Sequence, residues 1–324
     1  MKKNLRSVIY STLLTVVLLA ILFYNISFQE ILQAIGSVGW QFLLVGMGFH
    51  IGAYIFRTFV LWLFFRKHDV SFYLILRTHF VHNFYVHVVP ASLGELSFPI
   101  LLKNKIEMSK SLSILLISRI LIMAITLLLF FISVYEVFGL SDFFQFQTKY
   151  FFYLIGLAAV VGMSYFFRKQ IKNLIMKLPK SQQLAEKAQK LLTQLKLNVF
   201  LLKNPLFMFS AILFTAFNIL FVAGYYISIL EGLHISLSLF EVLFVSSIGL
   251  AFTILPIKSI GGFGTTEGAW TIGLMLLGIT KAVAIPASFA LHIFALANVC
   301  IMFFIGILLQ LIAKKEKIQN GGNN

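Results

Sequence analysis

The sequence predicts an all-α polytopic membrane protein, and three observations support this fold class. Hydrophobic residues make up 60% of the 324 positions. Charged residues make up only 11%, whereas a soluble domain carries roughly 25%. Several apolar runs approach the ~20 residues that a helix needs to cross a bilayer. Since no polar stretch is long enough to fold alone, we expect one integral-membrane domain over residues 1–324.

Six segments are long and apolar enough to be full spans. They lie at about 7–26, 40–65, 112–138, 150–167, 206–230 and 283–312. Two further segments, at about 70–103 and 237–280, are apolar but interrupted by proline, glycine and charged residues. We therefore expect six spans and two re-entrant or broken helical hairpins. The first run could also be a signal peptide, but it is longer than a usual apolar core and no small-residue cleavage site follows it.

Basic residues concentrate on one side of this arrangement. If the N-terminus is cytoplasmic, 20 of the 26 Lys and Arg residues fall in cytoplasmic segments. The positive-inside rule then places both termini in the cytoplasm and the loop near Asp142 outside. In this topology the hairpin at 70–103 enters from the cytoplasm, and the hairpin at 237–280 enters from outside.

The segment 168–203 carries nine of these basic residues, and its leucines recur at helical spacing. We expect it to lie on the anionic cytoplasmic leaflet as an interfacial helix, with an ordinary cytoplasmic loop as an equal alternative. Its charges follow the topology, so nucleic acid is not an expected partner. Residues 313–324 are expected to form a disordered cytoplasmic tail. The single cysteine, Cys300, excludes an internal disulfide and a cysteine metal cluster, and no cofactor or metal is expected.

The two interrupted segments are similar to each other. Residues 90–105 read PASLGELSFPILLKNK, and residues 256–270 read PIKSIGGFGTTEGAW. Each passes from proline through glycine to a glutamate, Glu95 in the first and Glu267 in the second. They fall in a first half over 1–138 and a second half over 206–312. Paired interruptions of opposite orientation are typical of inverted-repeat transporters; chance similarity is the alternative.

A cationic or potentially cationic side chain follows each glutamate at similar spacing. Arg119 lies 24 residues after Glu95, and His292 lies 25 residues after Glu267. Each carboxylate could cap a helix, pair with a cation or carry a proton, and the sequence leaves these alternatives open.

The glycines and proline of the second segment predict a break in a membrane helix. Such a break is tolerated only where the backbone is buried in protein or lines a polar cavity. Pro256 ends one helix, and we expect Gly262 and Gly264 to adopt a positive φ or to approach another group closely. Thr265 or Thr266 could cap the helix that follows. The resulting helix N-terminus suits an anion such as a lipid phosphate; close helix packing is the alternative explanation for the glycines.

We expect the two hairpins to meet near the midplane and to form a polar groove for an anionic headgroup. Lys258 and Arg119 would hold the phosphate, while the two glutamates would gate the groove or couple it to protons. The predicted site consists of Glu95, Arg119, Lys258, Gly262, Gly264, Glu267 and His292, with Pro90, Gly94, Pro256, Arg77 and His82 in support.

Other polar residues in the apolar sequence allow more than one interpretation. His79, His82 and His87 precede the first break, and a metal site with a nearby glutamate is a minor alternative to hydrogen-bonding or titrating histidines. Arg57 and Arg77 lie near span ends, where snorkelling toward the membrane surface explains them equally well.

These segments resemble the membrane domain of the lysylphosphatidylglycerol synthases, the flippase-like domain, and its stand-alone relatives. The motifs that carry the resemblance are Pro90, Gly94, Glu95 and Arg119 in the first half and Pro256, Gly262, Gly264 and Glu267 in the second. The resemblance covers nearly the whole chain and implies lipid handling, because this domain is implicated in moving modified lipids between leaflets. We expect a stand-alone member without the soluble aminoacyl-transferase domain, so synthase activity does not carry over.

The chain departs from the family pattern at several charged positions. Three uncharged residues stand where the family commonly has charged ones: Ser92, Ser118 and Ile122. His292 stands near a position where arginine is common in the family. These differences leave the identity of the substrate open. The sequence predicts a plasma-membrane translocase for an anionic phospholipid or a lipid-linked intermediate, and a transporter more than an enzyme. The alternatives are an integral-membrane lipid-phosphate transferase, for which no Asp-x-Asp pair is present, and a non-catalytic partner of a separate lipid-modifying enzyme.

Overall fold

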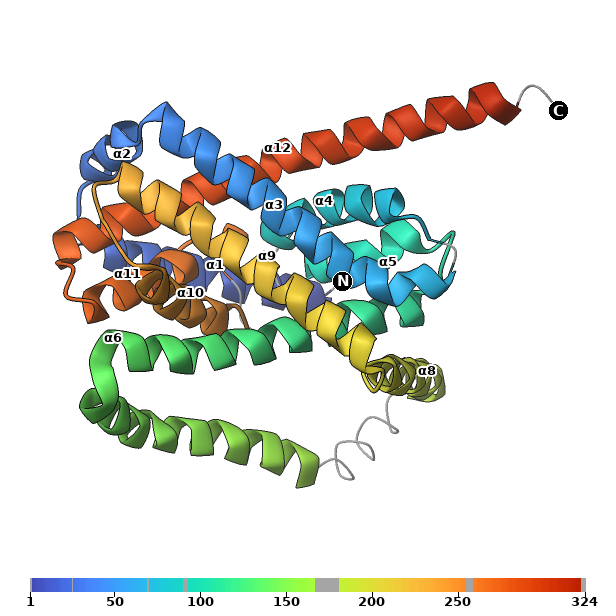
Figure 1. Ribbon diagram of the computed structural model, residues 1–324, viewed down its shortest axis with the longest axis horizontal. Helices are drawn as coiled ribbons and strands as arrows, with labels where there is room; N and C mark the ends of the chain where they lie inside the picture. Colours follow the sequence, from blue (N-terminus) through green and yellow to red (C-terminus); the bar gives the residue numbers. More distant parts are fainter. Residues whose placement is uncertain are drawn as a thin grey trace.

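The computed structural model describes residues 2–24, 26–68, 70–89, 93–166, 181–254 and 259–321, and within these ranges every regular element is a helix (Figure 1). The elements are α1 (Lys2–Phe23), α2 (Phe28–Ser37), α3 (Trp40–Phe65), η1 (Arg66–His68), α4 (Phe72–Val88), η2 (Leu93–Leu96), α5 (Ser97–Leu102), α6 (Met108–Phe166), α8 (Ser181–Leu201), α9 (Pro205–Gly232), α10 (Leu239–Ile254), η3 (Ile260–Gly262), α11 (Thr265–Leu276) and α12 (Lys281–Gly321). The predicted all-α class is confirmed.

Four helices are long and apolar enough to cross a membrane. They are Trp40–Phe65, Met108–Gly139, Pro205–Gly232 and Lys281–Ala313, and they correspond to four of the six predicted spans. The predicted first span ends earlier than expected. The segment Thr15–Phe23 of α1 is long and apolar enough to cross a membrane only when it is taken together with α2, and the two helices are bent by 85°.

The predicted span at 150–167 falls in the arm of α6 that follows Gly139, where the backbone leaves helical geometry (φ 76°, ψ 178°). The side chains of that arm lie outside the described residues. Residues 168–180 of the predicted basic segment and residues 322–324 of the predicted tail also lie outside the described residues. The described part of that tail continues α12 to Gly321, and the disorder of the tail stays a prediction.

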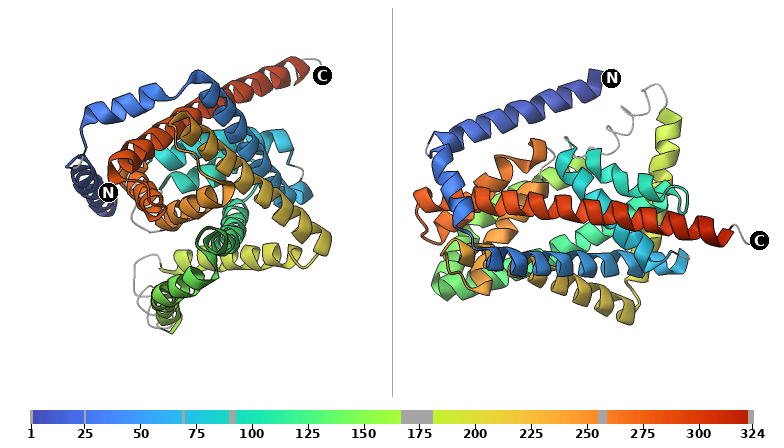
Figure 2. Two further views of the ribbon diagram at one scale, coloured as in Figure 1. Left: turned by 60° about the vertical axis from the view of Figure 1, so that its left-hand side comes forward. Right: turned by 90° about the horizontal axis from the view of Figure 1, so that it is seen from above.

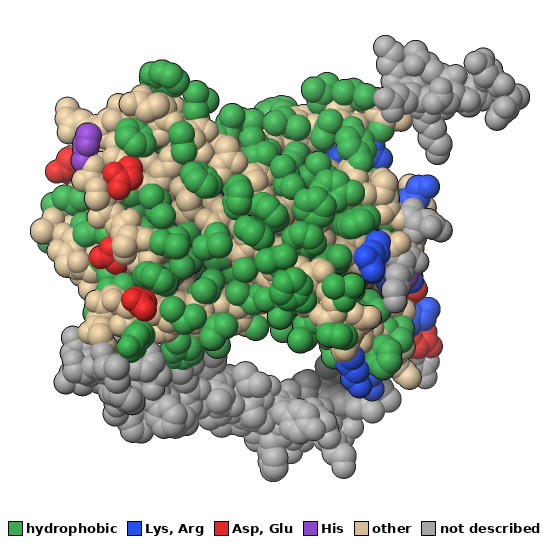
Figure 3. All heavy atoms as spheres, in the orientation of Figure 1, with side chains coloured by type: hydrophobic (Ala, Val, Ile, Leu, Met, Phe, Trp, Pro, Cys, Tyr) green, Lys and Arg blue, Asp and Glu red, His purple; other side chains and the backbone are tan. Residues whose placement is uncertain are grey.

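The bundle separates charge along its length. A broad band of hydrophobic side chains covers the face shown in Figure 3. Lys and Arg gather at one end, the basic end, beside some Asp and Glu, whereas Asp and Glu without Lys or Arg are seen at the other, the acidic end. Along the chain, basic residues follow the ends of three helices: Arg66 follows α3, Lys103 and Lys105 follow α5, and Lys203 follows α8. Acidic residues lie in other elements: Glu30 in α2, Glu136 in α6 before Gly139, Glu231 near the end of α9 and Glu241 near the start of α10. Both chain termini lie toward the basic end (Figures 1 and 2). An apolar band between two charged rims is the surface expected of a protein that spans a bilayer.

The two interrupted segments form helical hairpins that enter the bundle from opposite ends (Figure 1). The first hairpin, α4–η2–α5, opens toward the basic end, and the second hairpin, α10–η3–α11, opens toward the acidic end. Their tips meet inside the bundle, because η3 contacts α4. The described part of the second break, from Ser259 to Gly264, thus lies inside protein, where its polar groups can be satisfied.

Each hairpin packs against the span that follows the other hairpin: α4 lies on α12, and α10 lies on α6. The spans that precede the hairpins, α3 and α9, pack against each other.

Glycines make the α3–α9 contact close and reciprocal. Gly52 of α3 faces the ring of Phe221, and Gly224 of α9 faces the ring of Phe49. The two rings meet edge to face, with centroids 5.7 Å apart. Small residues let membrane helices approach closely, which is a main source of their association in lipid. This contact fixes the position of α3, which carries several of the polar residues described next.

Candidate functional site

The break in the second hairpin is built from glycines in left-handed backbone conformations. Gly261, Gly262 and Gly264 have φ values of 64°, 82° and 86°. Residues with a side chain rarely adopt such values. A Cβ on Gly264 would also lie 2.5 Å from the Cβ of Leu18 in α1. The predicted positive φ at Gly262 and Gly264 is confirmed.

Glu267 stabilises the start of the helix that follows this break. Gly264 occupies the N-cap position of α11, and its backbone N–H donates to Oε2 of Glu267 over 2.7 Å. The predicted cap by Thr265 or Thr266 is therefore wrong, because the residue before the helix needs a positive φ. The Thr265 hydroxyl instead donates to the carbonyl of Gly262 over 3.0 Å.

The same carboxylate holds a histidine from the last span. Oε1 of Glu267 lies 2.7 Å from Nδ1 of His292 on α12. The Glu267 side chain is 0% exposed, and that of His292 is 5% exposed. Both carboxylate oxygens thus have partners, and the pair can share one proton between an acid and a base. We call Glu267 and His292 the buried pair. Pro256 and Lys258, two further predicted site residues, lie outside the described residues.

The first hairpin places its glutamate by close packing. A Cβ on Gly94 would collide with the carbonyl oxygen of Tyr85 and lie 2.8 Å from the Cα of Val86. Only glycine lets η2 lie this close to the backbone of α4. As a result, Glu95 is held beside α4 and turned toward α6. Pro90, predicted to begin this break, lies outside the described residues.

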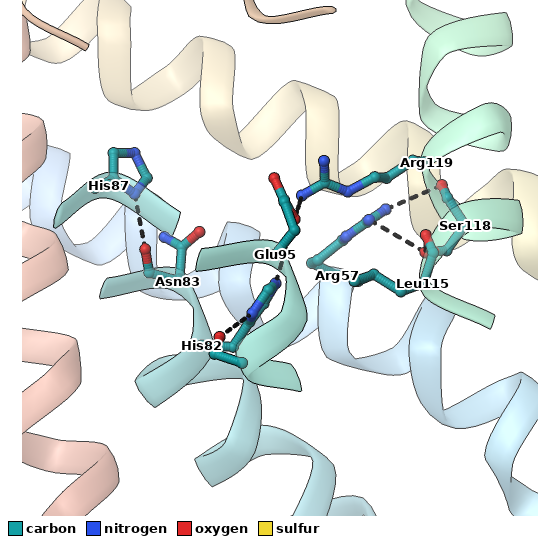
Figure 4. Close-up of polar contacts among 9 residues, drawn as sticks. Arg57, His82, Asn83, His87, Glu95, Leu115, Ser118 and Arg119 are labelled. Carbon is teal, nitrogen blue, oxygen red and sulfur yellow. Dashed lines mark hydrogen bonds and ion pairs between the residues drawn. The ribbon is translucent and has the colours of Figure 1, made fainter. Parts of the chain in front are cut away.

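Glu95 pairs with a guanidinium from a different span (Figure 4). Oε2 of Glu95 pairs with Nη2 of Arg119 on α6. Nε2 of His82 lies 4.0 Å from the same oxygen, and Nδ1 of His82 lies 2.7 Å from the hydroxyl of Ser97.

A second arginine adjoins this pair. Nη1 of Arg57 on α3 donates to the carbonyl of Ser118 over 3.1 Å, and Nη2 donates to its hydroxyl over 3.2 Å (Figure 4). Arg57 therefore points into the bundle, and the snorkelling alternative does not describe it. We call Glu95, Arg119, Arg57, Ser118 and His82 the arginine cluster.

The arginine cluster carries more positive than negative charge. With Glu95 ionised and His82 neutral, two guanidinium groups face one carboxylate. The Arg119 side chain is 39% exposed and that of Glu95 is 17% exposed, so the pair is accessible from outside the bundle. Guanidinium groups bind phosphate oxygens two at a time and keep their charge in apolar surroundings. The arrangement can therefore accept an anion.

The sequence analysis did not assign Arg57 and Ser118 to the site. Their contact joins residues 61 positions apart. The one signal was that Ser118 stands where a charged residue is common in the family.

Arg77, in contrast, joins neither group of residues in the described contacts. Its guanidinium lies 5.6 Å from the ring centre of Tyr73, and its Nε is buried without a partner among the described residues.

The remaining histidines of the first hairpin bind protein groups. Nδ1 of His79 lies 3.1 Å from the hydroxyl of Thr58, and Nδ1 of His87 lies 2.8 Å from the carbonyl of Asn83. Within the described part of the chain, no three His, Cys, Asp or Glu side chains are grouped so that they could hold a metal ion.

A cavity of about 470 Å³ opens at the basic end, away from these residues, and is lined by Glu107, Glu186, Gln189, Lys190, Thr193 and Gln194. The lining of this cavity includes two carboxylates and no arginine. The arginine cluster is therefore better suited to bind an anion.

Comparison with known proteins identifies one family. The family model described as the lysylphosphatidylglycerol synthase TM region matches residues 8–302. This range includes both hairpins, the arginine cluster and the buried pair. No curated protein matches the chain, and no solved structure does.

Proposed function

Since the chain belongs to the lysylphosphatidylglycerol synthase TM-region family, we propose that it moves an anionic lipid between the leaflets of a membrane. The substrate is a phospholipid or a lipid-linked intermediate whose headgroup carries a phosphate. Membership of this family supports a membrane protein that handles lipids, and the site chemistry supports the finer assignment.

The arginine cluster is the observation that carries this proposal. Charged side chains within spans are costly and usually mark the path of a substrate or an ion. Here Arg57 and Arg119 lie on spans α3 and α6, and Arg119 is partly exposed. A phosphate could pair with these arginines while the acyl chains stay in the surrounding lipid. The backbone N–H groups of the first turn of α11 could serve the same headgroup from the second hairpin.

The arrangement of the hairpins supports alternating access. They open toward opposite ends of the bundle, and each packs on the span that follows the other. A two-fold axis in the membrane plane would produce this reciprocal packing of hairpins and spans, which supports the inverted repeat. Movement of one hairpin against the other could then expose the arginine cluster to one leaflet at a time. Glu95 and the buried pair would act as the gates, since each joins a hairpin to a neighbouring span.

We further propose that the chain lies in the plasma membrane with both termini in the cytoplasm. The termini lie toward the end where Lys and Arg gather, which supports this orientation. Single cysteines in a Cys300→Ser background test this topology. Lys105→Cys at the basic end should react only with cytoplasmic reagent, and Ser236→Cys at the acidic end only with external reagent. The reverse labelling pattern would overturn the orientation.

The test of function is a leaflet-exchange assay with purified protein in vesicles. Vesicles containing fluorescent phosphatidylglycerol are treated with albumin, which extracts labelled lipid from the outer leaflet only. Arg119→Gln should slow the exchange by about tenfold or more, since a hydrogen bond to a charged group contributes about 1.5–3 kcal/mol. Arg66→Gln, at the exposed end of α3, is the matched control and should exchange lipid as the unchanged protein does.

Two results would contradict the proposal. One is the absence of exchange above protein-free vesicles. The other is conversion of the labelled lipid to a new product, seen by mass spectrometry, which would favour a lipid-phosphate transferase.

A further inference from the structure

Histidines are concentrated inside the membrane-spanning part of the bundle. Of the seven histidines in the chain, His68 and His234 lie in connections between helices, whereas the other five lie within α3, α4 and α12. These five are His50, His79, His82, His87 and His292. Ionisable side chains inside a membrane are rare, and chains of them are typical of proton relays. Their positions relative to Glu95 and Glu267 are therefore informative.

From Glu95 the histidines lead along α4 into the bundle. His82 lies 4.0 Å from the carboxylate and within electrostatic range of His79 and His87. The His79 ring lies against Tyr54 of α3, with centroids 5.3 Å apart. The Tyr54 hydroxyl in turn accepts a hydrogen bond from the side chain of Asn83.

At the centre of the bundle, His50 of α3 lies between two tyrosines. Its ring is 5.1 Å from that of Tyr54 and 4.7 Å from that of Tyr225 on α9. His87 lies within electrostatic range of His50. Nδ1 of His50 is buried and has no hydrogen-bond partner among the described residues. A buried ring nitrogen without a partner is a place where a bridging water can bind and pass a proton.

The tip of the second hairpin continues this path to the buried pair. A Cβ on Gly261 would lie 4.0 Å from the carbonyl of His87, and one on Gly262 would lie 3.4 Å from the ring of His292. The tip thus lies between these two histidines. His292 then pairs with Glu267 at 2.7 Å. The histidines, with the glycine backbone of the hairpin tip between His87 and His292, therefore form a series of neighbouring groups from Glu95 to Glu267.

We propose that the chain couples lipid movement to protons that pass between Glu95 and Glu267 along this histidine path; the proposal rests on the proposed function. In each cycle one carboxylate binds a proton from its side of the membrane, and the other releases one to the opposite side. Between them, each imidazole binds a proton at one ring nitrogen and releases one from the other. Among the described residues, the other charged or titratable groups that face the path include Arg57, Arg119, Tyr54 and Tyr225.

The arginine cluster explains how a proton could act on the lipid. When Glu95 binds a proton, its carboxylate becomes neutral and Arg119 loses its anionic partner. Arg119 is then available to a phosphate. When Glu95 ionises again, it competes with the phosphate for Arg119 and favours release. A ligand shifts such an equilibrium only by binding its two states differently, and this exchange of anions provides that difference.

His50→Phe tests the path. Phenylalanine keeps the ring contacts with both tyrosines and removes a buried nitrogen without a partner, so the variant should melt at the same temperature or higher. The matched control is His234→Asn at the acidic end, where φ is 60° and asparagine is tolerated. The probe is labelled phosphatidylglycerol in vesicles with a trapped pH-sensitive dye and a clamped membrane potential.

In the unchanged protein, a pH difference across the membrane should accelerate net lipid movement, and proton entry should require phosphatidylglycerol. His50→Phe should reduce this acceleration by about tenfold or more, because a positioned proton-transfer group contributes a factor of about 10² to 10⁴. Exchange at equal pH should stay unchanged, and His234→Asn should behave as the unchanged protein.

Three results would overturn the proposal, and they separate it from the proposed function. Lipid exchange that ignores the pH difference would remove the coupling and leave lipid movement intact. A full pH effect in His50→Phe would exclude the path through His50. The absence of lipid exchange under every condition would refute the proposed function and the coupling with it.

Discussion

The two hairpins contain the same parts and use them differently. Each has glycine, then glutamate, then a potentially cationic side chain on a following helix. In the second hairpin Glu267 is 0% exposed and holds both the backbone of Gly264 and the ring of His292. In the first hairpin Glu95 is 17% exposed and pairs with an arginine that is 39% exposed.

The glycines differ as well. Gly262 and Gly264 are required because their backbone has a positive φ, whereas Gly94 is required because α4 is too close for a side chain. The first hairpin thus leaves its charged pair accessible, while the second ties its carboxylate to its own backbone and to α12. Substitutions in the two hairpins should therefore have different effects on stability and on lipid exchange.

The largest effect is expected for Gly94→Ala. The added methyl group would collide with backbone atoms of Tyr85 and Val86, which cannot move aside as a flexible side chain could. We expect a loss of about 3 kcal/mol or more, at the upper end of overpacking costs. Thermal unfolding of the detergent-solubilised protein measures it. The control is Gly268→Ala in α11, where no atom lies within 4 Å; equal melting of the two variants would show that η2 does not pack on α4 as described.

Glu267→Ala should have the next largest effect. It removes a helix cap, which contributes about 1 kcal/mol, and leaves a buried histidine without its partner, which costs about 1–3 kcal/mol. We therefore expect a loss of about 2–4 kcal/mol in the same unfolding measurement. Glu267→Gln keeps an acceptor for the N–H of Gly264 and should recover more than half of it. An alanine variant as stable as the unchanged protein would contradict the structural role of Glu267.

The smallest change in stability is expected for Glu95→Gln. The pair with Arg119 is partly exposed, and such ion pairs contribute at most about 1 kcal/mol. Its effect on lipid exchange should nevertheless be large, because Arg119 loses the group that competes with phosphate. We expect near-normal melting with altered pH dependence of exchange. Strong destabilisation by Glu95→Gln would show that both hairpins use their glutamates structurally, and the contrast between them would fail.

Gly306 of α12 is in a tightly packed position, although the sequence around it does not indicate this. A Cβ there would lie 2.9 Å from the Cβ of Phe80 and 3.2 Å from the carbonyl of Arg77. The glycine sits in a long apolar span, and nothing in its local sequence distinguishes it from one that faces lipid. It serves a contact with α4, more than 200 positions earlier in the chain. Gly268, inside the second hairpin, is the more tolerant position.

Local features of the site could be predicted from the sequence. The positive φ values of Gly262 and Gly264 follow from a glycine-rich break inside an apolar segment, which is a property of the chain nearby. The choice of helix cap was missed, because Thr265 is a good cap by residue type but the position before the helix requires glycine geometry. The contact between Arg57 and Ser118 was missed because it depends on how α3 lies against α6.

The sequence by itself determined that this chain is an integral membrane protein. It also determined at which residues the helices break and which end of the bundle is basic. Those properties follow from composition, glycine and proline, and the cost of placing charge in lipid. The tertiary structure alone decided that Arg57 binds Ser118, the neighbour of Arg119, that Glu267 is fully buried while Glu95 is not, and that His50 lies between Tyr54 and Tyr225. The physical reason is that lipid is as apolar as the helix faces, so hydrophobic pattern does not select which faces meet. Close packing at glycines and the satisfaction of buried polar groups make that selection.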